Sequence, residues 1–214
     1  MTADYAKKFN DNVAAITSWA PLKEGGASFK TYKLVSVSPS RLEFRSTWYA
    51  ILFYTVFTGL GSGLVIASLY NAFSETFQVE NLSILQITAG LIFLFSGLTM
   101  FIKNVAPVVF DKSLGYYWKG FKKPRHDSIY KKPDVFFRII DIYALQLISE
   151  LVKGNKRSYF SYELNIIYRD GNRKNIVDHG NIEKLREDAE KLSSFINRPL
   201  WSDTREKDGY LNDL

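Results

Sequence analysis

The chain has no cysteine among its 214 residues and only two histidines. The lack of cysteine excludes disulfides, thiol nucleophiles and thiolate metal sites, and it agrees with a reducing compartment. The sequence also has no HExxH motif, no G-x-S-x-G motif, no phosphate-binding glycine loop and no dinucleotide fingerprint. We therefore expect no cofactor and no metal, and we favour a non-catalytic function.

Charge is missing from two long stretches. Residues 46–74 and 81–102, which are 29 and 22 residues long, contain no Asp, Glu, Lys or Arg. At about 1.5 Å per helical residue, the shorter stretch spans about 33 Å, enough to cross a hydrocarbon core of about 30 Å. Trp48, Tyr49 and Tyr70 lie near the ends of the first stretch, where aromatic rings favour the lipid–water boundary. We predict a two-helix transmembrane hairpin over residues 47–103, with spans at 48–71 and 82–102.

Basic residues are also missing from the link between the two spans. Arg41 and Arg45 precede the first span and Lys103 follows the second, whereas the link carries Glu75 and Glu80. Because Lys and Arg are biased toward the cytoplasmic side, both termini should be cytoplasmic. Neither span contains an ionisable group, which argues against a proton relay or an ion pathway.

Small residues recur at every fourth position of the first span, at Gly59, Gly63 and Ala67. This spacing forms a flat groove that permits close helix packing. The groove has two interpretations. It seats the second span through Gly90 and Gly97, or it forms the seam of a homo-oligomer.

The clearest pattern in the rest of the chain is period two. Residues 159–168, YFSYELNIIY, are apolar or aromatic at every even position, which predicts a half-buried strand. Asp170-Gly171 then suits a tight turn into a second strand at 174–177. A helix capped by Asn181 should follow and end before Pro199. Its apolar stripe consists of Ile182, Leu185, Ala189, Leu192, Phe195 and Ile196.

Other strands are predicted on both sides of the apolar stretches. Residues 29–37 and 42–45 flank a Ser-Pro-Ser turn, and residues 108–110 and 116–118 flank a turn with Gly115. Residues 135–152 fit either a strand or a helix. We favour strands, because residues 139–143 are β-branched and aromatic and because the adjacent hairpin needs partners.

The order of these elements resembles the pleckstrin-homology-like (PH-like) superfold. It is similar to bacterial membrane proteins in which a transmembrane helix pair interrupts a small PH-like barrel closed by a C-terminal helix. The phrases that carry the resemblance are SPSRLEFR at 38–45, FDK at 110–112, DIYALQ at 141–146 and SYELN at 161–165. The resemblance covers residues 29–200 and implies a membrane α+β protein of the bacterial inner membrane, with an antiparallel PH-like β domain and a C-terminal amphipathic helix.

The expected organisation follows from this resemblance and from the spans. An N-terminal segment (1–28) precedes the first PH-like strands (29–46), the hairpin (47–103), the remainder of the domain (104–200) and a flexible tail (201–214). Such a fold implies a scaffolding or regulatory module that presents its domain to a membrane or cytoplasmic protein partner or to anionic lipid headgroups.

The densest basic cluster lies within residues 119–132. Its five cations are Lys122, Lys123, Arg125, Lys131 and Lys132. Each cation near an anionic leaflet contributes about 1 kcal/mol, so the cluster is a candidate lipid-binding loop. The alternative is a solvated loop that keeps an edge strand soluble. We expect no nucleic-acid partner, because core strands account for the neighbouring aromatic residues.

One pair of residues supports a function of another class. Asp178 and His179 are adjacent, and a carboxylate beside an imidazole suits acid–base chemistry. The pair would make the protein a lipid-acting interfacial enzyme or an enzyme subunit. A turn-and-cap function of residues 178–181 is the simpler interpretation.

Overall fold

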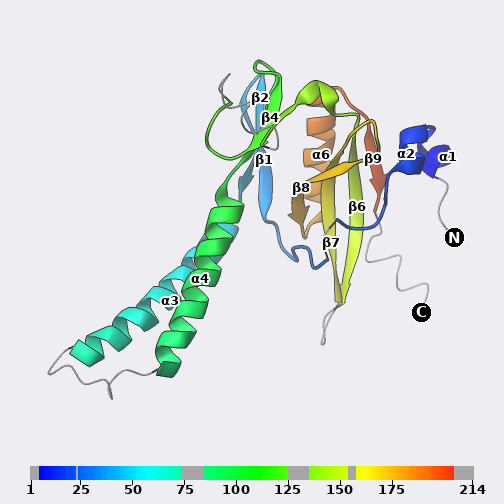
Figure 1. Cartoon of the computed structure of the whole chain (residues 1–214). Coiled ribbons are helices and arrows are strands. Elements are labelled where there is room, and N and C mark those ends of the chain that lie inside the picture. Colours follow the sequence, from blue (N-terminus) through cyan, green and yellow to red (C-terminus); the bar gives the residue numbers. More distant parts are fainter. Residues whose placement is uncertain (1–4, 23, 74–83, 125–134, 154–157, 205–214) are drawn as a thin grey trace. The chain divides into compact units, whose positions relative to one another are not determined.

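The computed structural model describes residues 5–22, 24–73, 84–124, 135–153 and 158–204. The chain divides into two compact units (Figure 1). Residues Ser46–Ala106 form one unit, and Met1–Arg45 together with Pro107–Leu214 form the other. The larger unit is therefore built from the chain on both sides of the apolar helices.

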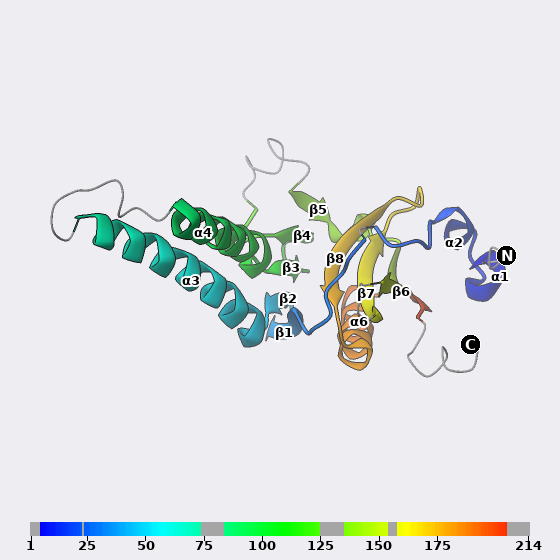
Figure 2. The ribbon, with the colours of Figure 1, turned by 90° about the horizontal axis from the view of Figure 1, so that it is seen from below.

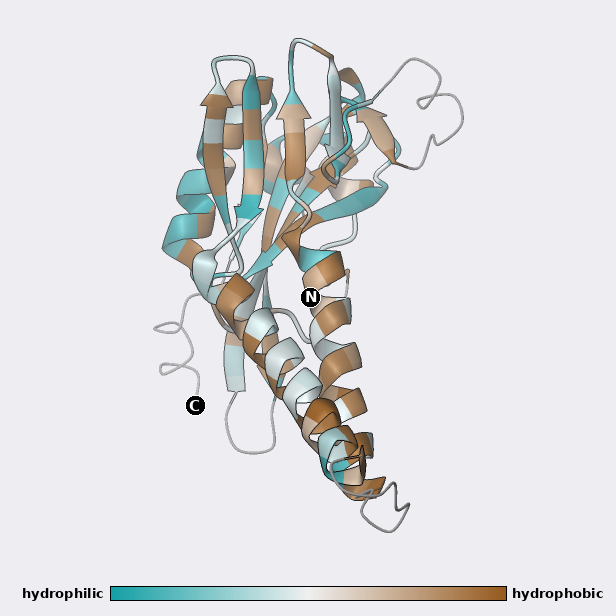
Figure 3. Ribbon diagram, turned by 90° about the vertical axis from the view of Figure 1, so that its left-hand side faces the viewer, coloured by the Kyte–Doolittle hydropathy of each residue, from teal (hydrophilic) through white to brown (hydrophobic). Residues whose placement is uncertain are grey.

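The smaller unit contains two long helices, α3 (Trp48–Phe73) and α4 (Ile84–Val105). Both are long and apolar enough to cross a membrane, and Figure 3 shows apolar residues along their length. Only 17% of the most apolar 18-residue window of α3, and 11% of that of α4, is buried. A core helix of a soluble domain would bury most of such a surface. The residues between the two helices, 74–83, lie outside the described part of the chain.

Glycines bring α3 and α4 into close contact. On α4 they are Gly90 and Gly97, as predicted, but on α3 the contact is made by Gly61 and not by the predicted Gly59 and Gly63. A Cβ atom added to Gly61 would lie 2.3 Å from the backbone nitrogen of Leu94 and 2.7 Å from the carbonyl oxygen of Gly90. A Cβ atom added to Gly97 would lie 2.6 Å from the backbone nitrogen of Thr58.

The predicted groove of Gly59, Gly63 and Ala67 lies on a face of α3 that does not contact α4. A Cβ atom on Gly59 or Gly63 would meet nothing within 4 Å, and Ala67 is exposed. The interpretation that Gly59, Gly63 and Ala67 seat the second helix is therefore wrong. No pattern in the sequence indicates which face of α3 packs, because the helix is apolar all round.

In the larger unit, five strands form the first sheet, which we call sheet A. The strands are β1 (Tyr32–Ser38), β2 (Arg41–Ser46), β3 (Val108–Asp111), β4 (Tyr116–Lys119) and β5 (Phe136–Arg138). They lie in sequence order, and the pairs from β2 to β5 are antiparallel. Leu42 faces Phe110 across β2 and β3, which joins the chain before the apolar helices to the chain after them.

Sheet B has four strands in the order β8-β7-β6-β9. They are β6 (Ala144–Lys153), β7 (Ser158–Ile167), β8 (Arg173–His179) and β9 (Leu200–Asp203). The hairpin of β7 and β8 is confirmed, with Gly171 at a φ of 78° in its turn. The preference for strands in residues 135–152 is also confirmed by β5 and β6, which are joined by a short 3-10 turn, Ile139–Asp141.

The prediction of a flexible tail over residues 201–214 is wrong at its start. Residues 201–203 are part of β9 and not of a flexible tail, and β9 pairs with β6 in parallel. Trp201 is buried at this edge of the sheet. Residues 205–214 lie outside the described part of the chain.

The main core lies between the two sheets and helix α6 (Ile182–Ile196). The Asn181 side chain accepts a hydrogen bond from the backbone N–H of Lys184 at 2.8 Å, which confirms the predicted cap. The core residues of α6 are Ile182, Leu185, Ala189, Leu192 and Ile196. They pack with apolar side chains of both sheets, including Phe44, Phe110, Leu145 and Leu164.

The described part of the N-terminal segment packs against the edge of sheet B. It contains the short helices α1 (Tyr5–Phe9) and α2 (Asn12–Ile16). Trp19 stacks on Tyr5 and Phe9, with ring centroids 4.1 and 5.1 Å apart, and Phe9 also stacks on Trp201 of β9. This aromatic cluster attaches the start of the chain to the edge of sheet B.

Candidate membrane-facing surface

The described part of the basic cluster starts at the end of β4. The backbone N–H of Gly120 donates to the carbonyl oxygen of Pro107 at 2.8 Å, and Pro107 comes two residues after the end of α4. Phe121 follows with 73% of its surface exposed, and Lys122 and Lys123 are exposed beside it. An exposed aromatic ring and two cations therefore begin next to the chain that leaves the second apolar helix.

The other three predicted cations are Arg125, Lys131 and Lys132. They lie outside the described residues. The site is therefore described by Phe121, Lys122 and Lys123 alone.

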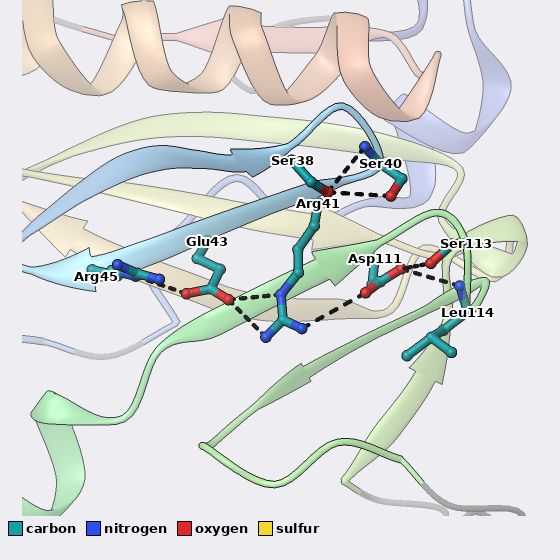
Figure 4. A network of polar contacts seen from close by, with 8 residues as sticks. All are labelled: Ser38, Ser40, Arg41, Glu43, Arg45, Asp111, Ser113 and Leu114. Carbon is teal, nitrogen blue, oxygen red and sulfur yellow. Dashed lines mark hydrogen bonds and ion pairs between the residues drawn. The ribbon is translucent and has the colours of Figure 1, made fainter.

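Charged side chains also occupy one face of β2 and β3 (Figure 4). Because side chains alternate along a strand, Leu42 and Phe44 enter the core, and Arg41, Glu43 and Arg45 lie on the opposite face. Glu43 is 4% exposed and accepts hydrogen bonds from the Nε atoms of both arginines, each at 2.7 Å.

The same network reaches the β3–β4 turn. The Nη1 atom of Arg41 lies 3.8 Å from the carboxylate of Asp111, which accepts hydrogen bonds from the hydroxyl of Ser113 and the backbone N–H of Leu114. Two carboxylates thus balance two guanidinium groups. We conclude that this network holds β2, β3 and the β3–β4 turn together and does not bind an anion. Arg45 is the more exposed of the two arginines in the network, and it lies three residues before the start of α3.

Asp178 and His179 are not arranged as an acid–base pair. They are adjacent in β8, so their side chains lie on opposite faces of sheet B. The Asp178 carboxylate accepts a hydrogen bond from the side-chain amide of Asn175 at 2.9 Å. His179 instead contacts backbone atoms, with Nδ1 accepting from the N–H of Asn181 at 2.9 Å and Nε2 lying 3.2 Å from the carbonyl oxygen of Tyr32.

The environment of His179 keeps its ring neutral. The ring is 1% exposed, and burial lowers the pKa of His179 from 6.5 to about 4. Nδ1 must be unprotonated to accept a hydrogen bond from Asn181. Nε2 therefore carries the proton and donates a hydrogen bond to the carbonyl oxygen of Tyr32. His179 therefore links β8 to β1 and to the start of α6. Among the described residues, no three histidine or carboxylate side chains lie close enough together to hold a metal ion.

A second polar surface, which was not predicted from the sequence, lies on the face of sheet B opposite α6. Ser161, Glu163 and Asn165 alternate with the core residues of β7, which is the pattern of a solvent-facing side. All three are nevertheless at most 2% exposed. Residues 18–22 and 24–26 lie over them, and Gly25-Gly26 is the one sequence signal of such a close approach.

Comparison of the chain with protein-family models, with curated proteins and with solved structures finds no match in any of the three.

Proposed function

We propose that the protein is a non-catalytic membrane-anchored module, in which α3 and α4 cross a bacterial inner membrane and the larger unit works at its cytoplasmic face. In this proposal the module scaffolds or regulates a membrane or cytoplasmic protein partner, and anionic headgroups help to hold it at the surface. The observation that carries the proposal is the hydrogen bond from Gly120 to Pro107. This bond joins Gly120, which directly precedes Phe121, Lys122 and Lys123, to Pro107, which comes two residues after the end of α4, a helix suited to a membrane.

Such a segment gains free energy at an anionic lipid surface in two ways. An exposed phenylalanine favours the boundary between headgroups and acyl chains, and each lysine gains about 1 kcal/mol near an anionic leaflet. The PH-like fold is part of the proposal. It is supported by a β domain whose C-terminal helix packs into the core, although β9 adds a parallel strand after that helix.

The first test measures the depth of Phe121 in the bilayer. Because the chain has no cysteine, Phe121→Cys provides a single site for a spin label on the full-length protein in liposomes. In acidic liposomes we expect the label to lie at the headgroup boundary. It should move into water in neutral lipid, at high salt, or when Lys122, Lys123, Arg125, Lys131 and Lys132 are all changed to Gln.

A matched control lies at the other end of β4. Leu114 is also an exposed apolar residue, in the β3–β4 turn, and a label at Leu114→Cys should stay in water in both lipids. If the label at position 121 is as accessible to water as the label at position 114 in acidic liposomes, lipid binding is rejected and protein recognition remains as the function.

The second test concerns topology. Reporter fusions at residues 30 and 214 should both report the cytoplasm, and a fusion between residues 71 and 80 should report the opposite side. The reason is the placement of Arg41, Arg45 and Lys103 outside the link and of Glu75 and Glu80 within it. Termini on opposite sides of the membrane would show that only one helix spans it.

A further inference from the structure

The face of sheet B opposite α6 carries a buried polar surface. Gln146, Asn165 and Asn175 face one another across β6, β7 and β8. The amide nitrogen of Asn165 donates to Gln146 at 3.3 Å and to the Glu163 carboxylate at 3.1 Å. The exposed fractions of Gln146 and Asn165 are 0%, and that of Glu163 is 2%. A second layer of structure must therefore cover this face.

That layer is the described part of residues 18–30, which we call the N-terminal strap. Figures 1 and 2 show the strap and α6 on opposite sides of sheet B. Both Glu163 carboxylate oxygens accept from the N–H of Leu22 at 3.0 Å, and the Glu150 carboxylate accepts from Gly25 and Gly26 at 2.9 and 3.2 Å.

Three more hydrogen bonds join side chains of the sheet to the backbone of the strap. Gln146 donates to the carbonyl oxygen of Ser18 at 3.0 Å, Arg173 to that of Ala20 at 2.8 Å, and Tyr159 to that of Gly26 at 3.0 Å. In these three bonds a side chain of the sheet binds the backbone of the strap, and at the end of the strap the backbone N–H of Gly180 donates to the carbonyl oxygen of Phe29 at 3.0 Å. The surface therefore recognises an extended main chain, with little dependence on the side chains that it carries.

The strap is suited to leave this surface without unfolding the domain. Trp19 is held in the aromatic cluster with Tyr5 and Phe9, but beyond it no described residue before Thr31 is buried, and Leu22 and Phe29 are 39% and 40% exposed. Each hydrogen bond to the strap replaces one to water at a small net gain, and ordering each residue costs free energy of the same order. The surface beneath is polar, so water can replace the strap.

One position restricts what can bind. A Cβ atom on Gly26 would lie 2.2 Å from the hydroxyl oxygen and 2.8 Å from the Cβ atom of Ser161. Ser161 is fully buried, and its hydroxyl has no hydrogen-bond partner in the described part of the chain. Only glycine fits opposite it.

We propose that this face of sheet B is a binding groove for an extended, glycine-containing peptide segment of a protein partner, and that the N-terminal strap occupies the groove until the partner displaces it. The inference rests on the proposed function in one respect, since it places the binding site of the protein partner named there. Two carboxylates, Glu150 and Glu163, select backbone N–H groups, and Ser161 selects glycine.

The test uses the full-length chain in detergent and a labelled peptide with the sequence of residues 17–31. The wild-type chain should bind this peptide weakly, because its own strap is present at a high effective concentration. Gly26→Leu should expel the strap from the groove and strengthen peptide binding at least tenfold by fluorescence anisotropy. A peptide with leucine in place of Gly26 is the matched control and should bind neither protein.

Hydrogen exchange of the wild-type chain gives a second measurement, which remains decisive if Gly26→Leu fails to fold. The amides of Leu22, Gly25 and Gly26 should exchange much faster than those in the β6–β7 ladder. Equal protection, or a folded Gly26→Leu protein that binds the peptide no better than wild type, overturns the proposal. If the chain instead forms a concentration-dependent dimer in which each copy binds the strap of the other, the occupant of the groove is a second copy, and the proposal of a different protein partner is overturned. The spin-label depth of Phe121 does not depend on the strap, so the two proposals fail separately.

Discussion

Gly61→Leu should separate α3 from α4 and lower the stability of the helix pair by about 3 kcal/mol, the upper end of the usual cost of overpacking. The added side chain would meet the backbone of Leu94 and Gly90, at 2.3 and 2.7 Å from its first carbon atom. Backbone atoms in a helix cannot rotate away as a side chain can, so the helices must move apart. The measurement is thermal unfolding in detergent, followed by circular dichroism.

Gly63→Leu provides the control, because it adds the same side chain to the same helix two residues away. A Cβ atom at Gly63 meets nothing within 4 Å, so this variant should unfold like the wild-type chain. Equal losses in the two variants would contradict the α3–α4 contact described here. If Gly63→Leu instead dissolves a dimer without changing the stability of the helix pair, the groove of Gly59, Gly63 and Ala67 is a seam between two copies.

The second large effect is loss of stability in acid through His179. The pKa of His179 is about 4 in the folded chain and about 6.5 when unfolded, so the unfolded chain binds the proton more tightly. The contribution of the neutral ring is therefore fully present above pH 6.5 and is lost as the pH falls from 6.5 toward 4. A difference of about 2.5 pKa units corresponds to about 3 kcal/mol of unfolding free energy.

His179→Asn isolates this contribution. The asparagine oxygen can accept from Asn181 as Nδ1 does, but the variant cannot take up a proton. It should be less stable than wild type at pH 7, because the carbonyl oxygen of Tyr32 loses its donor. The difference between the two proteins should shrink below pH 6.5, as measured by denaturant unfolding at each pH.

The difference in stability between wild type and His179→Asn also excludes the contributions of other groups that titrate between pH 7 and pH 4. Burial raises the pKa of Asp188, which accepts a hydrogen bond from Leu34, so this carboxyl changes stability with the opposite sign. Its contribution is the same in both proteins and cancels in the difference. A constant difference between pH 7 and pH 4 would show that His179 is not held neutral by burial.

Local patterns in the sequence predicted the elements well. Period-two alternation placed β7, Asp170-Gly171 placed the hairpin turn, and Asn181 placed the start of α6. These signals work because a strand face, a positive φ and a helix cap each depend on residues within a few positions of one another. The same holds for the extents of α3 and α4, which follow from unbroken apolar runs.

The candidate sites were less predictable, because they depend on which faces meet. Uniformly apolar helices carry no stripe that shows which side packs, so the spacing of Gly59 and Gly63 suggested a contact that Gly61 makes. His179 was expected in a turn and is instead buried between β1 and α6, through contacts to residues on either side of the apolar helices.

The sequence alone determined that this protein has two uninterrupted apolar helices, a β-rich remainder and a basic segment directly after β4, since composition and short-range periodicity decide these properties. That the polar side of β7 is covered, in contrast, follows from long-range contacts of the folded chain. The hydrogen bond from Leu22 to Glu163 joins residues 141 positions apart, and no local pattern encodes a contact of that separation. Alternation shows that a face is polar, but whether that face meets water or main chain depends on what the rest of the fold places over it.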